Sequence, residues 1–92
     1  MNYTVRVELH DATWDDYGTL HTAMGQVGFS RTIKGDDGKL YQLPTAEYDA
    51  SGNCDATQVR TLASGAAAKT GKKFAVLVTT AGVRAWVGLV AS

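Results

Sequence analysis

The sequence has one cysteine, one proline, no net charge and no long apolar run, and each of these limits what the protein can be. The single thiol, Cys54, cannot form an internal disulfide and supplies no cysteine cluster for a metal. Nine basic and nine acidic residues cancel, so a nucleic-acid partner would need a local basic patch, because phosphate neutralisation supplies much of the affinity. No apolar stretch has the length of a membrane span or a signal core, and we expect a cytoplasmic protein without a membrane partner.

The length and composition indicate a single domain over residues 1–92. A chain of 92 residues has no room for a second core, and 45% hydrophobic residues are too many for a disordered chain. The sequence also contains no glycine-rich phosphate loop and no nucleophile motif. We therefore expect no small-molecule cofactor.

Residues 3–9 alternate apolar and polar side chains without interruption, which is the pattern of a β-strand with one buried and one solvated face. Arg6, Glu8 and His10 follow one another on the solvated face. The apolar face carries Tyr3, Val5, Val7 and Leu9.

Turn and capping signals divide the rest of the chain. Thr13 starts one helix and Asp55 another, because each can accept a hydrogen bond from a free backbone N–H at the helix start. Pro44 interrupts a strand, since proline lacks the N–H that a ladder needs. The elements that we expect after the first strand are a helix over 13–28, strands over 29–34 and 39–50, a helix over 55–71, and strands over 73–79 and 83–90.

This order, β-α-β-β-α-β with an additional C-terminal strand, predicts an α+β, ferredoxin-like sandwich with both helices on one face of an antiparallel sheet. Residues 73–79 are almost all apolar, which predicts burial on both faces or in an interface. Residues 83–90 are too apolar for a free edge. They either pair with a second copy in a homodimer or form a hairpin with residues 73–79 in one chain.

The solvated face of the first strand is the main candidate site. Glu8, His10 and Asp11 are suited to general acid–base cleavage of RNA, with proton transfer by the imidazole, or to binding a divalent metal. Arg6 or Arg31 would neutralise the phosphate. The alternative is a set of ion pairs on a solvated face that contribute little to stability.

A second group of residues is suited to holding a nucleic acid. Lys69, Lys72 and Lys73 form the one basic cluster, although lysines at a helix end also serve as partners of the helix dipole. Tyr41 could stack on a base, whereas the alternation places Tyr48 in the core.

Residues 3 to about 60 resemble the GhoS family, the antitoxins of type V toxin–antitoxin pairs. Most of the matching positions are structural ones, and the best patch is the hairpin. The matches, which run without a gap, are Tyr3, Val5, Glu8, Leu20, Met24, Phe29-Ser30, Gly38, Gln42-Leu43, Tyr48 and Val59.

The resemblance implies a fold similar to that of the CRISPR adaptation nucleases and endoribonucleolytic cleavage of the messenger that encodes a membrane toxin. It also implies that Glu8 lies where related proteins place an acidic, metal-binding residue near a twofold axis. The family helix carries arginines where this chain has Thr19 and His21, so cleavage is either retained, altered or lost.

We therefore expect an antitoxin-type protein that binds single-stranded RNA and acts as an endoribonuclease. One alternative is a non-catalytic module that binds RNA or a protein. The other is a structural domain whose role is dimerisation.

Overall fold

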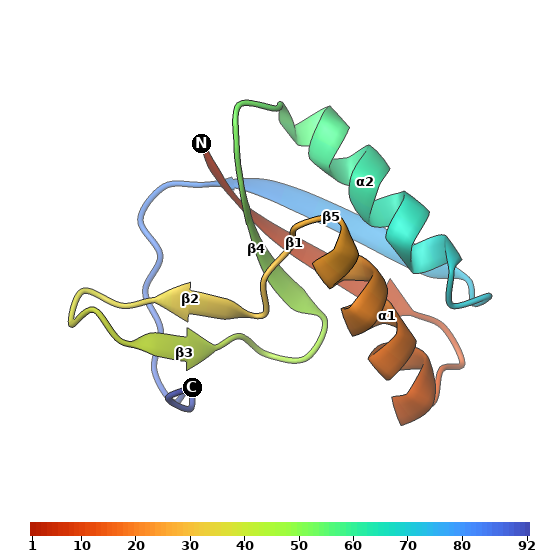
Figure 1. The fold of residues 1–92 in the computed structure, drawn as a ribbon, viewed down its shortest axis with the longest axis horizontal. Coiled ribbons are helices and arrows are strands. Elements are labelled where there is room, and N and C mark those ends of the chain that lie inside the picture. Colours follow the sequence, from red (N-terminus) through yellow and green to blue (C-terminus); the bar gives the residue numbers. More distant parts are fainter.

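The computed structural model describes residues 1–92 and shows an α+β fold with two helices and antiparallel sheets (Figure 1). Both helices cover the same face of the main sheet, and the core lies between these two layers. The elements are β1 (Asn2–Leu9), α1 (Trp14–Gln26), β2 (Thr32–Lys34), β3 (Leu40–Gln42), β4 (Glu47–Ser51), α2 (Ala56–Ala68) and β5 (Phe74–Ala81).

Strand β1 is the centre of the main sheet, whose strand order is β4-β1-β5 with antiparallel pairing on both sides. The alternation expected for residues 3–9 is confirmed, because Tyr3, Val5, Val7 and Leu9 are all at most 6% exposed. The intervening side chains, Arg6 and Glu8, are exposed on the opposite face. We call the sheet surface that faces away from the helices the open face.

The two helices begin where the capping signals predict. Thr13 and Asp16 form a capping box at the start of α1, and Asp55 and Gln58 form another at the start of α2. Each box satisfies two of the backbone N–H groups that a helix start leaves free. The buried faces consist of Leu20, Ala23 and Met24 on α1 and of Val59, Ala63, Ala66 and Ala67 on α2.

The expected strand over residues 39–50 is divided in two. β3 ends at Gln42 and β4 begins at Glu47, with Pro44 and a left-handed Ala46 (φ 68°) between them. β2 and β3 then form a separate two-stranded sheet, which is joined to β4 by a single bridge between Ser30 and Asp49. Because of this division, the hairpin does not continue the main sheet as regular strands.

The expected C-terminal strand over 83–90 is wrong. This segment is a loop that passes the hairpin and ends beside β3, where the Gln42 N–H donates to the Val90 carbonyl at 2.9 Å (Figure 1). Gly88 has a positive φ of 82°, which takes the chain out of an extended conformation. Val83 and Val87 are therefore left almost fully exposed.

The expectation that residues 73–79 are buried on both faces is also wrong within one chain. β5 is an edge strand, and its Leu77 side chain lies on the open face with 62% exposure. Only the side chains that face the helices, such as those of Val76 and Val78, pack against the core.

One polar pair lies at the edge of the core. The His21 Nδ1 is 2.6 Å from the Tyr48 hydroxyl, so this histidine is a hydrogen-bonded core-edge residue. Burial, and then the nearby charge of Arg31, lower the pKa of His21 below its usual value. Burial raises the pKa of Tyr48 to about 12.

The lowered pKa of His21 predicts a loss of stability in mild acid. Below about pH 6.5 the unfolded chain takes up a proton at His21 more readily than the folded chain does. The stability that neutral His21 contributes is therefore present above that pH and is lost as the pH falls. In urea denaturation at pH 7.5 and 5.5, the free energy of unfolding should fall more for the wild type than for His21→Gln. Equal falls would contradict this role of His21.

Candidate nucleic-acid interface

The open face carries a row of charged groups along β1. Glu8 lies opposite Ala75 of β5, and Arg6 lies between Leu77 of β5 and Glu47 of β4. Residues directly opposite one another in an antiparallel pair point to the same face. The charged row is therefore flanked by small or apolar side chains on the β5 side and by an acidic one on the β4 side.

Two ionisable side chains meet at the end of this row, and a third residue with a charged side chain lies on the adjacent strand. The Glu8 Oε1 is 3.4 Å from the His10 Nε2, and their side chains are 68% and 50% exposed. The His10 N–H donates to the Lys73 carbonyl at 2.9 Å, which extends the ladder between β1 and β5 by one pair. Because paired residues share a face, Lys73 is placed beside His10 and diagonally opposite Glu8. Glu8, His10 and, on the adjacent strand, Lys73 thus lie on the same solvent-accessible face of the sheet.

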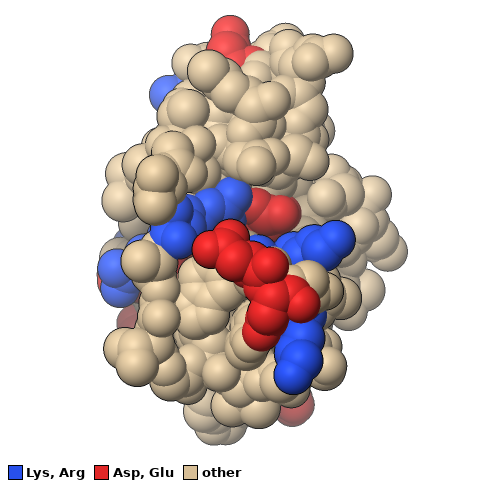
Figure 2. Space-filling model, turned by 90° about the vertical axis from the view of Figure 1, so that its left-hand side faces the viewer, with Lys and Arg blue, Asp and Glu red and all other residues tan.

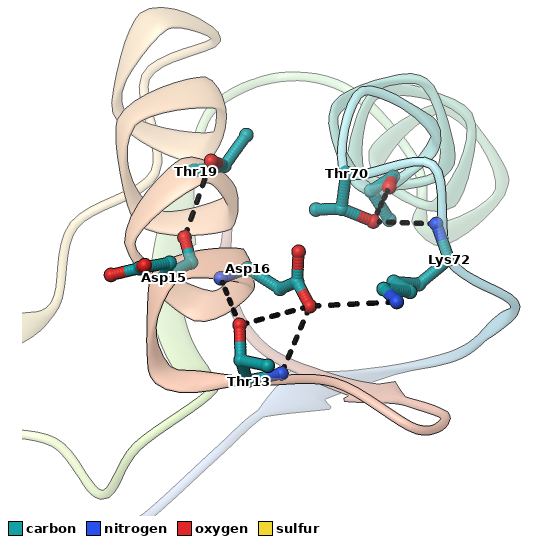
Figure 3. A network of polar contacts seen from close by, with 7 residues as sticks. Thr13, Asp15, Asp16, Thr19, Thr70 and Lys72 are labelled. Atoms are coloured by element: carbon teal, nitrogen blue, oxygen red, sulfur yellow. Dashed lines mark hydrogen bonds and ion pairs between the residues drawn. The ribbon is translucent and has the colours of Figure 1, made fainter.

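The loop after His10 is held in place by the start of α1 (Figure 3). The Asp16 Oδ2 accepts a hydrogen bond from the Thr13 N–H at 2.9 Å and lies 3.8 Å from the Lys72 Nζ. The Thr13 N–H is the largest cause that lowers the pKa of Asp16, and Lys72 adds to it. The Lys72 N–H donates to the Thr70 hydroxyl, so the start of α1 is linked to the segment that precedes Lys73.

The predicted basic cluster is divided among three surfaces. Lys69 borders a shallow hollow with Gly18 and Thr19 of α1, Lys72 pairs with Asp16, and Lys73 lies on the open face. The structure therefore brings only Lys73 to Glu8 and His10.

Asp11 and Arg31 are not part of this group of three. Asp11 is exposed in the loop after β1, where its φ of 52° is unusual for a residue with a side chain. The charge of Arg31 acts on His21 and Tyr48 at the edge of the helix-covered core, so Arg31 lies away from the open face.

Tyr41 lies in the hairpin, and its hydroxyl group already has a hydrogen-bond partner within the hairpin. Its hydroxyl donates to the Asp37 Oδ2 at 2.6 Å, and this bond lowers the pKa of Asp37. The ring packs against Trp86, with 5.7 Å between ring centroids. Figure 2 shows that basic and acidic side chains are mixed on this side of the molecule, so it offers no surface of one sign to a phosphate backbone.

The residues of the open face do not form a complete metal site. Glu8 and His10 supply two candidate ligands, and no group of three or more His, Cys, Asp or Glu side chains is placed to hold a metal ion. Divalent cations bound by carboxylates normally have six or more ligands. The expectation that Glu8 holds a metal therefore gains no support from the geometry.

No pattern in the sequence indicates the contact that holds the C-terminal segment. The Arg84 Nη2 donates to the Asp49 Oδ1 at 2.7 Å, and the residues around this ion pair line a hollow of about 490 Å³ with Lys34 and Trp86. The contact joins residues that are 35 positions apart and depends on the path of a loop. Apolar periodicity cannot reveal such a path.

A comparison with protein-family models decides the family. A model described as endoribonuclease GhoS matches residues 1–87, which is nearly the whole chain. The chain belongs to the GhoS family. The match extends beyond the region of sequence resemblance to include β5 and Lys73, so the open face of this GhoS-family chain lies wholly within it.

No curated protein matches the chain at a significant level. Neither helix has both the length and the apolar character that crossing a membrane requires.

The link between α1 and the preceding loop can be tested by stability measurements. Thr13→Ala should lower the free energy of unfolding by about 1 kcal/mol, because the Asp16 N–H loses its acceptor at the start of the helix. Thr13→Ser keeps the hydroxyl and should retain most of the stability. Lys72→Gln should have a smaller effect than Thr13→Ala, because its ion pair with Asp16 is long, at 3.8 Å, and still reached by solvent. Urea denaturation measures the free energy of unfolding of all three variants. A loss of stability in Lys72→Gln as large as that in Thr13→Ala would contradict the larger contribution of the helix cap.

Proposed function

We propose that this GhoS-family chain is an antitoxin-type endoribonuclease that binds single-stranded RNA on its open face and cuts it beside Glu8 and His10. The observation that carries the proposal is the convergence of these two side chains, 3.4 Å apart, with Lys73 on the adjacent strand. The family description supplies the reaction class, and the geometry supports a place for it.

Cleavage of RNA without a metal needs three groups. A base takes the proton from the 2′-hydroxyl, whose oxygen attacks the adjacent phosphorus. An acid gives a proton to the 5′-oxygen as its bond to phosphorus breaks, and a positive charge stabilises the phosphate oxygens in between. In this proposal Glu8 is the base, His10 is the acid and Lys73 is the cation, with Arg6 contacting the next phosphate.

The contact between Glu8 and His10 is useful to both roles. The carboxylate and the imidazole are close enough to act on the same phosphodiester, one on each side of the phosphorus. Both side chains remain accessible, so a flexible single strand can reach them without a deep pocket. A duplex would present its 2′-hydroxyls in a fixed geometry, and single strands are the usual target of sequence-dependent RNA recognition.

We also infer that the fold is a ferredoxin-like one in which the start of the hairpin takes the place of the second strand, the edge strand next to β4. The bridge between Ser30 and Asp49 supports this, because it places the start of the hairpin beside β4. In this arrangement the open face is the surface on which RNA would lie. For the family's antitoxin role, the RNA is a messenger that encodes a toxin.

The catalytic assignment predicts a specific loss of cleavage. Glu8→Gln and His10→Gln should each slow the cleavage of a single-stranded oligoribonucleotide by about 100-fold or more, the usual contribution of a general acid or base. Glu47→Gln is the matched control, because Glu47 lies across β1 from Leu77, beside Arg6 and outside the group of three. Circular dichroism should show that all three variants are folded.

Two results would refute the assignment. Wild-type rates in Glu8→Gln and His10→Gln would exclude these residues as acid and base. RNA binding without cleavage by the wild type would show a non-catalytic RNA-binding protein instead.

A further inference from the structure

The outer edge of β5 has no partner within the chain. The bond from the His10 N–H to the Lys73 carbonyl sets the register, so the odd-numbered residues of β5 direct their backbone groups toward β1. The even-numbered residues therefore direct theirs away from the sheet. Four N–H groups and four carbonyls form this free edge, those of Phe74, Val76, Val78 and Thr80.

The usual protections of a free edge are missing from β5. Residues 74–81 contain no charged residue, no proline and no glycine, all of which discourage the pairing of exposed edges. The segment after β5 does not cover this edge, because Arg84 crosses the sheet to Asp49 of β4 and Ala91 pairs with Tyr41 of β3. In Figure 1 the chain leaves the end of β5 toward the hairpin.

We propose that β5 pairs antiparallel with β5 of a second copy of this chain, about a twofold axis at Leu77. With Leu77 opposite its own copy, Val76 faces Val78 and Phe74 faces Thr80, so every outward backbone group of the strand gains a partner. A shift of the register by two residues leaves outward groups unpaired at the strand ends. The result is a six-stranded sheet with the order β4-β1-β5-β5-β1-β4.

The side chains and charges of β5 fit a second copy of the same strand. The exposed Leu77 side chain packs against Leu77 of the second copy on the open face, and Ala75 faces Thr79. The charged residue that precedes the strand, Lys73, falls opposite Ala81. The two lysines are then about 27 Å apart along the strands, so like charges do not meet.

The dimer would join two candidate sites on one surface. Three strand spacings of about 4.8 Å separate the two β1 strands, so the two Glu8–His10 pairs lie on a continuous open face. The dimer itself rests on the edge of β5 and not on the proposed cleavage. The sequence suggested a dimer contact through residues 83–90, but these residues form no strand, and β5 takes their place in the proposed dimer.

Disulfide cross-linking tests the register directly. In a Cys54→Ala background, Leu77→Cys should form a disulfide-linked dimer under mild oxidation, because residues facing each other at a non-hydrogen-bonded position have Cα atoms about 4.5 Å apart. Ala75→Cys is the matched control and should not link to itself, since it faces Thr79. A mixture of Ala75→Cys and Thr79→Cys chains should link. Self-linking of Ala75→Cys as fast as that of Leu77→Cys would overturn the register.

Sedimentation equilibrium tests the dimer without modification. The wild type should show the mass of two chains at high concentration, and Leu77→Lys should keep the mass of one chain because two lysines would meet at the axis. Val87→Lys, a change of an exposed valine away from β5, should dimerise like the wild type. A wild type with the mass of one chain at all concentrations would overturn the proposal, as would a dimer that Leu77→Lys does not weaken. Circular dichroism should show that each variant is folded.

Discussion

The arrangement of the molecule depends on the central position of β1. This strand is hydrogen-bonded on both sides, and one of its faces is closed by the core. A shift of its register by one residue would bury Arg6 and Glu8 and expose Tyr3 and Val5, which fixes the pairing strongly. The open face must therefore carry the charged row. The candidate site follows from the same alternation that builds the core.

The position of the site also depends on where β1 ends. His10 belongs to the last pair of the ladder, and Asp11 then turns the chain toward the capping box of α1. The ion pair between Asp16 and Lys72 links this turn to the segment before β5 (Figure 3). The same few residues thus end one strand, start a helix and place Lys73 beside His10. The contacts at the start of α1 therefore help to place Lys73 beside Glu8 and His10, although Lys73 is distant from them in the sequence.

Features set by neighbours in the chain could be predicted from the sequence, and features set by distant partners could not. The alternation of β1, both helix starts and the break at Pro44 were correct because each depends on a few adjacent residues. The apolar run after Gly82 suggested a strand, but the ion pair of Arg84 with Asp49 takes it elsewhere. The three lysines looked like one cluster, yet a helix end, a turn and a strand direct them to three surfaces. Glu8 and His10 were found together because they are two residues apart on a strand.

The claim that RNA binds the open face beside His10 can be tested most directly by nuclear magnetic resonance. A short single-stranded oligoribonucleotide would be titrated into the isotope-labelled chain at low salt, and the shift of each backbone amide would be measured. RNA bound at this site should give the largest shifts at Glu8, His10 and Lys73. Shifts confined to Tyr41 and Trp86, or no shifts at all, would contradict it.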